Sequence, residues 1–213
     1  MVLNSNKVTI IAISGASASG KTLLTDAIIA ECNQEMGQQC ISVLREDAYY
    51  KDQSHLSLEQ RKQINYDHPD AFDHVLLIKH LKLLKTGREV AMPVYDYQAH
   101  NRSTQTQTVQ PSCVIVVEGI LLLAVEALLT EFDIKVFMDT PLDICLMRRI
   151  KRDMAKRGRD IDSIMQQYLT SVRPMFFQFI QPSRENADVI VTRGGENRMA
   201  KELLKGHILG LLQ

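Results

Sequence analysis

The fold of this 213-residue chain is decided by the stretch Gly15-Ala16-Ser17-Ala18-Ser19-Gly20-Lys21-Thr22. The stretch has the spacing G-x-x-x-x-G-K-[ST], and it lies between a β-branched apolar run at 8–13 and a helical pattern at 21–36. A strand, a loop of this spacing and a helix, in that order, are the context in which the spacing forms a phosphate-binding loop. Its glycines let the backbone curl so that N–H groups converge on phosphate oxygens, next to the positive end of the helix. A Gly- and Ser-rich turn without a ligand is the alternative, and both flanks argue against it.

Every position of this loop is a candidate for binding a nucleoside triphosphate. The ammonium of Lys21 would neutralise the β- and γ-phosphates, and the hydroxyl of Thr22 would ligate Mg²⁺. The candidate cofactor-binding residues are therefore Gly15, Ala16, Ser17, Ala18, Ser19, Gly20, Lys21 and Thr22.

Apolar runs after the loop predict the rest of the architecture. Beside the strand at 8–13, short apolar runs predict strands at 40–44, 113–117, 134–138 and 187–191. Helical patterns at 121–129, 142–156 and 197–212 follow the last three of these strands. Strands that alternate with helices form a parallel sheet wound on both faces. We predict an α/β fold, a P-loop NTPase fold with a five-stranded parallel sheet flanked by helices.

Two polar segments do not fit this alternation and predict an insertion. Residues 92–97 and 104–109, the second with alternating Thr and Gln, predict a small antiparallel hairpin at 92–109 outside the main sheet. Ahead of it, a capping box at Ser57 opens a short helix, and a Leu-rich helix is expected at 75–85. No linker separates these parts, so we expect one domain over residues 1–213.

Charge and cysteine content exclude several classes of function. Lys and Arg number 25, and Asp and Glu also number 25, so the formal charge of zero argues against nucleic acid or an anionic membrane as the main partner. No apolar run approaches the roughly 18 residues that a membrane span needs. The cysteines form no C-x-x-C pair and are expected to be reduced core residues of a cytosolic protein. They are Cys32, Cys40, Cys113 and Cys145.

Two acidic residues follow predicted strands at the edge of the sheet where the phosphate loop begins. The carboxyl ends of parallel strands meet at one edge, and ligands gather there. Glu118 directly ends the strand at 113–117, where a carboxylate can hold Mg²⁺ or its water shell. Asp47 follows the strand at 40–44 and is a candidate to accept a proton from an attacking hydroxyl. A cap or turn role is the alternative for each of them.

The segment 142–160 combines an apolar stripe with a dense run of cations. Leu142, Leu146, Ile150 and Met154 recur every four residues and predict a buried stripe. Seven cations lie within twelve residues, and Gly158 interrupts the helix so that the last of them can move. A solvated helix face and a nucleic-acid patch are alternatives. Phosphoryl transfer needs cations and the exclusion of water, so we predict an Arg-rich lid at 152–162. The cations are Arg148, Arg149, Lys151, Arg152, Lys156, Arg157 and Arg159.

Further motifs make the chain similar to a known family. After the phosphate loop come E-D-x-Y-Y, Y-D-H-P-D-A-F-D, P-V-Y-D-Y-x-x-H-x-R, V-E-G-I-L, R-G-R-D and A-D-V-I-V-x-R-G-G. In this order, and over nearly the whole chain, they resemble the uridine kinases, the uridine-cytidine kinases of pyrimidine salvage. The resemblance implies transfer of phosphate from ATP or GTP, with Mg²⁺, to the 5′-hydroxyl of uridine and cytidine. It also implies a cytoplasmic homotetramer.

The resemblance implies roles for individual residues. Asp47 corresponds to the catalytic carboxylate, Arg193 to a contact of the phosphate donor, and Thr22 with Glu118 to the residues around Mg²⁺. The other positions are the phosphate-contacting cations Lys21, Arg152 and Arg157 and the acceptor ligands Tyr50, Asp67, Tyr95, His100, Arg149, Arg159 and Gln167.

The sequence departs from the family pattern at two positions, and some residues have alternative roles. Thr192 stands where proline often precedes R-G-G in the family, and Glu196 occupies a variable position, so contacts to the donor base near 193–195 are open. Tyr95 and His100 have packing roles as alternatives. Rival functions are a phosphoribulokinase-like or pantothenate-kinase-like enzyme and a nucleotide-sensing or nucleic-acid-binding P-loop module. The chain lacks the guanine-reading N-K-x-D of a GTPase.

Overall fold

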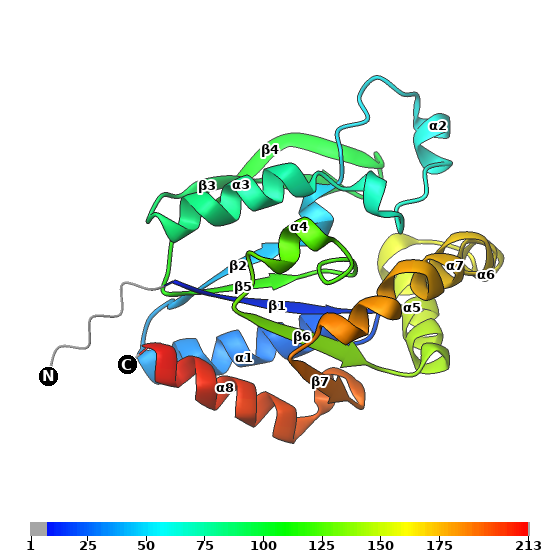
Figure 1. Cartoon of the computed structure of the whole chain (residues 1–213). Helices are drawn as coiled ribbons and strands as arrows, with labels where there is room; N and C mark the ends of the chain where they lie inside the picture. The colour runs from blue at the N-terminus through cyan, green and yellow to red at the C-terminus, as the bar shows by residue number, and fades with distance from the viewer. Residues whose placement is uncertain (1–7, 213) are drawn as a thin grey trace, which may run out of the picture.

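A parallel β-sheet forms the centre of the molecule (Figure 1). The computed structural model describes residues 8–212, and the two ends of the expected domain, 1–7 and 213, lie outside the described residues. The sheet strands are β1 Thr9–Gly15, β2 Ile41–Arg45, β5 Val114–Glu118, β6 Ile134–Asp139 and β7 Val189–Thr192. They pair in parallel in the order β2-β5-β1-β6-β7. The predicted five-stranded parallel sheet is confirmed.

Strand β1 lies where the order of the sheet reverses. Its neighbours β5 and β6 run parallel on either side, with Ile13 opposite Glu118 and Gly15 opposite Met138. In open α/β sheets, ligands bind in the crevice beyond the carboxyl ends of the strands at such a point. The phosphate loop continues directly from Gly15 and therefore lies in this crevice.

Helices cover both faces of the sheet (Figure 1). Helices α1 (Lys21–Met36) and α8 (Arg198–Leu212) lie side by side on one face. Helices α3 (His74–Lys85) and α4 (Glu126–Leu129) cover the other face. Alternate residues of β1 point to opposite faces, so each helical layer has an apolar core of its own. Each fully buried Leu or Ile side chain in these cores contributes about 1.5–3 kcal/mol.

The predicted insertion is an antiparallel hairpin outside the main sheet. It consists of β3 (Val90–Asp96) and β4 (Asn101–Val109). Both strands begin earlier than the segments 92–97 and 104–109, and Tyr97 lies in the connection instead of in a strand. The hairpin itself is therefore confirmed, and its turn is displaced toward the N-terminus.

Arg102 anchors the hairpin to the segment after β2. That segment is a 3₁₀ turn, η1 (Glu46–Tyr49). Arg102 Nη2 donates to the main-chain oxygen of Tyr49 at 3.3 Å and to Asp73 Oδ2 at 3.2 Å. Since Asp73 also caps α3, the hairpin, η1 and α3 are held together as one layer.

Short helical segments form the connections. The predicted capping box opens α2, because Ser57 N donates to Gln60 Oε1 at 2.9 Å and Gln60 N donates to Ser57 Oγ at 3.3 Å. At 161–180, where the sequence predicts no helix, α-helical and π-helical turns alternate. These segments are α2 Leu58–Lys62, α6 Ile161–Gln167, α7 Arg173–Met175, the 3₁₀ turns η2 Pro69–Ala71, η5 Pro182–Asn186 and η6 Gly194–Glu196, and the π-helical turns η3 Tyr168–Val172 and η4 Phe176–Ile180. In the described part of the chain, the helices are too short or too polar to cross a membrane.

Helix α5 (Leu142–Arg157) buries a face that the sequence does not predict. The predicted apolar stripe is only partly buried, and its last member, Met154, is 49% exposed. The buried row is Cys145, Arg149 and Asp153. The prediction of the inner face is wrong because this helix packs against the polar carboxyl end of the sheet. Buried charged side chains are tolerated there because ion pairs replace the water that would otherwise solvate them.

Two further expectations are wrong. The helix expected at 121–129 is confined to α4, because the N–H of Leu121 donates to Glu46 Oε2 at 3.0 Å and the chain then turns. Residues 121–123 are all buried leucines, which a helix with a single inner face does not allow. Cys113 is exposed, whereas the other three free cysteines are buried as expected.

We expect Gly119→Ala to destabilise the protein. A Cβ atom at Gly119 would collide with Cβ and Oε2 of the buried Glu46 side chain, which has hydrogen bonds that prevent it from moving away. Overpacking of this kind costs about 1–3 kcal/mol. For a chain of this size each kcal/mol lowers Tm by roughly 2–4 °C, which thermal unfolding followed by circular dichroism measures.

The control is Gly206→Ala in α8, where an added Cβ meets nothing within 4 Å. A helical Gly→Ala change without a clash raises stability by about 0.5–1 kcal/mol. A Tm of Gly119→Ala equal to or above that of the unchanged protein would contradict the packing of Glu46 against this glycine.

Candidate active site

The phosphate loop curls because three of its residues have left-handed backbone. The φ angles are 137° at Gly15, 63° at Ala18 and 102° at Gly20. Such turns direct successive N–H groups to one side, which makes a concavity for anions at the start of α1. Thr140, which follows β6, holds the loop in place because its Oγ1 donates to the main-chain oxygen of Ser19 at 2.9 Å.

The side chain of Lys21 is buried inside the curl. Its Nζ donates to the main-chain oxygens of Gly15 at 3.0 Å and Ala16 at 2.9 Å. Burial lowers the pKa of this ammonium, and the nearby carboxylates of Glu118 and Asp47 oppose that effect. The loop therefore holds a preformed cation at the place where a phosphate chain would lie.

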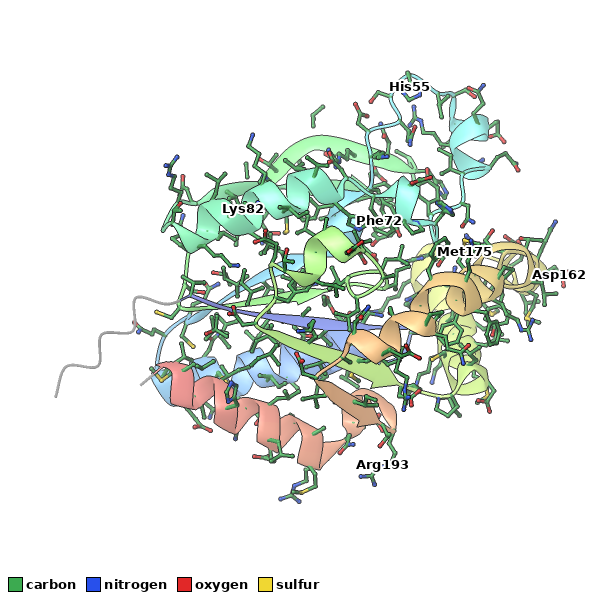
Figure 2. The ribbon with its side chains drawn as sticks, in the orientation of Figure 1. His55, Phe72, Lys82, Asp162, Met175 and Arg193 are labelled. Carbon is green, nitrogen blue, oxygen red and sulfur yellow. The ribbon has the colours of Figure 1, made fainter. Side chains whose placement is uncertain are left out.

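The loop at 193–195 packs directly on the phosphate loop. Gly195 lies so close to Gly20 that a Cβ atom on either residue would collide with the backbone of the other. At Gly194, a Cβ would lie 3.2 Å from the main-chain oxygen of Ser19. The side chain of Arg193 is exposed at the end of β7 (Figure 2). The structure therefore brings the glycines of the R-G-G motif to the phosphate loop by their backbone.

Glu118 and Thr22 offer oxygen ligands on two sides of the loop. Glu118 is 5% exposed; its Oε1 accepts a hydrogen bond from Arg45 Nε at 2.7 Å, and its Oε2 is buried without a hydrogen-bond partner. An unsatisfied buried carboxylate oxygen is costly unless a ligand completes it. Within residues 8–212 no group of three or more His, Cys, Asp or Glu could hold a metal ion. Mg²⁺ needs only one or two protein ligands beside phosphate and water, so these two residues fit it.

Asp47 lies in η1, directly beyond the carboxyl end of β2, as the sequence predicts. Its Oδ2 accepts a hydrogen bond from Tyr97 Oη at 3.2 Å. The charge of Asp47 raises the pKa of Lys21, which partly offsets the effect of burial. Burial raises the pKa of Tyr50, and the charge of Asp47 raises it further. Through Tyr97, whose ring centroid lies 5.2 Å from that of Tyr95, the carboxylate borders a group of aromatic rings.

Glu46 is a buried residue at this site that the sequence analysis does not single out. It is 0% exposed, and its Oε1 hydrogen-bonds with His74 Nε2 at 2.8 Å while its Oε2 accepts from Leu121 N at 3.0 Å. These bonds join η1 to α3 and to the segment after β5. Glu46 thus fixes the backbone that carries Asp47. The sequence signal was the acid pair in E-D-x-Y-Y.

Tyr50, Tyr66, Phe72 and Tyr95 form a continuous aromatic cluster. Tyr50 stacks on Phe72 with ring centroids 4.3 Å apart and lies 5.2 Å from Tyr66 and 4.8 Å from Tyr95. Phe72 lies in the interior, between α3 and the helices at the carboxyl edge of the sheet (Figure 2). The Tyr95 hydroxyl is buried without a hydrogen bond of normal geometry among the described residues. Burial raises its pKa, as does the neighbouring Tyr66 hydroxyl.

His100 borders this cluster. Its ring centroid lies 5.8 Å from that of Tyr66, whose hydroxyl donates to the main-chain oxygen of His100 at 3.1 Å. The backbone of His100 is left-handed, with φ of 47°. The imidazole is half-buried, and burial together with Lys62 and Arg159 lowers its pKa, so it is neutral near pH 7. The structure therefore brings Tyr50, Tyr95 and His100 together around the ring of Tyr66.

Asp67, Arg149, Arg159 and Gln167 also come together, at the base of α5 and α6. Gln167 Oε1 accepts hydrogen bonds from Arg149 Nη2, at 2.9 Å, and from Arg159 Nη1. Arg149 Nη1 donates to Ser17 Oγ of the phosphate loop at 3.1 Å. Asp67 lines the same cavity as Ser17 and Arg149, and burial raises its pKa while Arg149 lowers it. Ser17, Asp67 and Arg149, from three distant segments, thus line one cavity, and Gln167 and Arg159 are joined to it through Arg149.

The cations of the predicted lid surround a residue that the sequence analysis passes over, the buried Asp153. Arg152 Nε donates to its Oδ1 at 2.8 Å, and Arg157 Nη1 lies 3.6 Å from the same oxygen. The guanidinium carbon of Arg157 also lies 4.5 Å from the ring centroid of Tyr97, which is a cation–π contact. Tyr97 therefore touches both Asp47 and the lid. The only sequence signals were an acid inside the basic run and a second Tyr in P-V-Y-D-Y.

Comparison with known proteins finds relatives over nearly the whole length of the chain. A family model described as "Phosphoribulokinase / Uridine kinase family" matches residues 10–200. Uridine kinase from Escherichia coli is 54% identical over 208 residues, which is 98% of each chain, and uridine kinase from Cronobacter sakazakii is 53% identical over the same length and coverage. Among solved structures, phosphoribulokinase from Rhodobacter spheroides superposes with a TM-score of 0.67 at 16% identity, over 88% of this chain and 71% of that chain. The structural likeness concerns the fold alone.

We expect Asp67→Asn to stabilise the protein at alkaline pH. Because burial raises the pKa of the folded-state carboxyl, ionising it above that pKa costs stability, and protonation at low pH removes the cost. The amide cannot ionise. The gain in Tm should therefore be present at about pH 8 and shrink toward about pH 4, measured by thermal unfolding at both values.

The control is Asp143→Asn, the same change at an exposed position of α5. It should show no gain at pH 8. A lower Tm of Asp67→Asn at pH 8, or a gain independent of pH, would mean that the ionised carboxylate of Asp67 is stabilising in the folded protein.

Proposed function

This chain belongs to the phosphoribulokinase / uridine kinase family, whose P-loop kinase fold implies a nucleotide phosphate donor, and we propose that it phosphorylates the 5′-hydroxyl of uridine and cytidine with ATP or GTP. The products would be UMP and CMP. The observation that best supports this is the position of Asp47 directly beyond β2, where its Oδ2 accepts a hydrogen bond at 3.2 Å from Tyr97, whose ring lies 5.2 Å from that of Tyr95. A carboxylate between a triphosphate cradle and an uncharged pocket suits transfer to a neutral alcohol.

The pocket beside Asp47 favours a nucleoside over a sugar phosphate as the acceptor. Its rings are uncharged, and the unpaired buried hydroxyl of Tyr95 and the neutral imidazole of His100 supply the polar atoms that a pyrimidine edge would need. A phosphoribulokinase-like acceptor would need cations directed at its phosphate group, whereas Lys62 near His100 donates to Glu59 and Arg159 donates to Gln167. Arg61, at the border of the pocket, already donates to the main-chain oxygens of Leu56 and Ala99.

The cavity lined by Asp67 and Arg149 would hold the ribose. A buried carboxylate can accept hydrogen bonds from both the 2′- and 3′-hydroxyls, and Arg149 links this cavity to Gln167, which Arg159 also contacts. A deoxyribose would leave one acceptor unpaired, which costs about 1–3 kcal/mol. We therefore propose a preference for ribonucleosides at this site.

The residues of the chain would divide the transfer among them. Asp47 orients the 5′-hydroxyl and accepts its proton as the oxygen attacks the γ-phosphate in line. Lys21, Arg152 and Arg157 hold the charge that develops on the phosphate oxygens. Thr22 and Glu118 would hold Mg²⁺, which would supply positive charge to the phosphate oxygens when bound. Alignment of the two substrates supplies up to roughly 7–11 kcal/mol of the barrier reduction.

The finer assignments of the resemblance belong to the same proposal. The chain would act as one kinase domain over residues 1–213, with the hairpin at 92–109 binding the nucleoside and the lid at 152–162 excluding water. Arg193 would contact the donor with its exposed side chain, next to the glycines that pack on the phosphate loop. Assembly as a homotetramer, a cytoplasmic location and a role in pyrimidine salvage, with no nucleic-acid or membrane partner, complete the proposal.

The test is a panel of nucleosides with ATP and with GTP, in which 5′-monophosphates are detected by mass. We expect uridine and cytidine to react and kcat/KM for 2′-deoxyuridine to be about 5- to 150-fold lower, the equivalent of 1–3 kcal/mol. Donor consumption should depend on the nucleoside. Consumption at the same rate without any acceptor would favour a nucleotide-sensing module, and reaction only with phosphorylated sugars would favour the phosphoribulokinase-like rival.

We expect Asp47→Asn to retain binding of the nucleotide and to lower kcat by roughly two to four decades, the range for loss of a general base. Calorimetry of nucleotide binding and a coupled assay with uridine measure the two effects. Asp143→Asn is the matched control and should keep the kcat of the unchanged enzyme. Turnover of Asp47→Asn close to that of the control would remove Asp47 from the catalytic role.

A further inference from the structure

Asp153 is the centre of the charge arrangement at the carboxyl edge of the sheet. It lies on α5 and is 0% exposed. Its two carboxylate oxygens face four guanidinium groups: Arg152 Nε at 2.8 Å and Arg157 Nη1 at 3.6 Å from Oδ1, and Arg149 Nε at 3.6 Å and Arg159 Nη1 at 3.8 Å from Oδ2. Among the described residues, no other carboxylate has ion pairs with this many arginines.

The four arginines repel one another. Like charges that are partly buried repel more strongly than they would in bulk water, because the effective dielectric constant is lower. The pKa of Arg149 is lowered by burial, and further by Arg152 and Arg157. Burial acts against ionisation of Asp153, yet the hydrogen bond from Arg152 and the neighbouring cations hold its pKa below the usual range. One ionised carboxylate therefore keeps four cations together, and a net charge of three remains for an anion.

The same residue also fixes the turn after the helix. Its main-chain oxygen accepts the N–H of Gly158, which has φ of 61°, and that of Arg159 at 3.3 Å. The turn redirects the chain from α5 into α6, which brings Arg159 back toward Gln167. Both the side chain and the backbone of Asp153 thus determine where the arginines point.

Two of the arginines held by Asp153 connect it to other parts of the site. Arg149 contacts Ser17 of the phosphate loop, and Arg157 lies over Tyr97, whose hydroxyl donates to Asp47. The contacts form a continuous path from the phosphate loop, through Asp153, to the proposed catalytic carboxylate. Asp153 contacts neither the phosphate loop nor Asp47 itself, so it would act only through the arginines.

We infer that Asp153 is a positioning residue, which aims the guanidinium groups of Arg152 and Arg157 at the phosphate chain of the donor and holds those of Arg149 and Arg159 on the acceptor side. The inference rests on the proposed function for its effect on turnover, but not for its effect on donor binding. A negative charge in an anion site would ordinarily weaken anion binding. Asp153 instead strengthens it, because it orders the cations that bind the anion.

A purely charge-neutralising role predicts the opposite result. If Asp153 only reduced the positive charge, its removal would raise the net charge of the cluster from three to four and tighten the binding of any polyanion. If it positions the arginines, its removal lets them repel and separate, and donor binding weakens in spite of the added positive charge. The sign of the change in donor affinity distinguishes the two roles.

The first test measures binding without turnover. Calorimetry determines Kd for the Mg²⁺ complexes of AMP-PNP and GMP-PNP, of which the better ligand is used. We expect Asp153→Asn to raise Kd about tenfold, as for loss of a charge-assisted contact. Asp143→Asn, the same change at an exposed position of the same helix, should leave Kd within about twofold. Unchanged or tighter binding by Asp153→Asn would overturn the inference.

The second test separates positioning from damage to the fold. With uridine, kcat of Asp153→Asn should fall about tenfold or more, and donor consumed per monophosphate formed should rise above the value of the unchanged enzyme, because a misplaced lid admits water. Partial unfolding would lower kcat without changing this ratio or KM, and that result would overturn the inference. If the enzyme without substitutions binds the donor but phosphorylates no nucleoside, the proposed function is wrong. The effect of Asp153→Asn on donor Kd would still test the positioning role.

Asp153→Glu covers the case in which Asp153→Asn does not fold. It retains the charge and moves the carboxylate by one methylene, so we expect the protein to fold and to show the same weaker donor binding and poorer coupling, about threefold in each. Binding and coupling equal to those of the unchanged enzyme in Asp153→Glu would overturn the positioning role.

Discussion

The burial of one ammonium group, that of Lys21, is the constraint on which the rest of the site depends. A buried cation is tolerated only if oxygen atoms surround it, and the main-chain oxygens of Gly15 and Ala16 do so because the loop folds back over the lysine. That path needs left-handed backbone, which explains the glycines at the two ends of the loop. The neighbouring segments then pack on the curl: Thr140 from the end of β6 hydrogen-bonds to it, and Gly195 lies against its last residue. The crevice is therefore shaped by backbone atoms, which cannot rearrange as side chains do.

Several buried polar atoms around this crevice have no hydrogen-bond partner in the described residues. They include Glu118 Oε2, Ser19 Oγ and Tyr95 Oη. In a fold optimised for stability alone each of these atoms would be paired, because an unpaired buried polar atom costs about 1–3 kcal/mol. Together with Asp67, whose pKa burial raises, they mark the places where the protein gives up stability and where ligand atoms would restore it. Their clustering at one edge of the sheet is independent of the similarity to known kinases, and it points to the same place.

The parts of the site are joined by contacts between segments that are far apart in the sequence. Arg149 and Ser17 are 132 positions apart, and Tyr97 and Asp47 are 50 positions apart. The first contact joins the helix that begins the lid to the phosphate loop, and the second joins the inserted hairpin to the segment after β2. Because Arg157 lies over Tyr97, the lid and the hairpin also touch each other. A displacement of the segment at 152–162 would therefore also displace the surroundings of Asp47.

The amino-acid sequence by itself determined the strand, phosphate loop and helix at 8–36, the five parallel strands, the inserted hairpin and the acids beyond β2 and β5, because spacing and local backbone preference are properties of short segments. Only the tertiary structure decided which face of α5 is buried and how short the helix expected at 121–129 is. It also decided that Glu46 joins η1 to α3 and that Tyr97 contacts Asp47 and Arg157. Periodicity favoured the apolar row ending at Met154, whereas the row of Cys145, Arg149 and Asp153 is buried. The physical reason is that a charged side chain can be buried only if its partners meet it there, and those partners, Ser17 and Gln167 among them, come from segments that are brought together only when the chain folds.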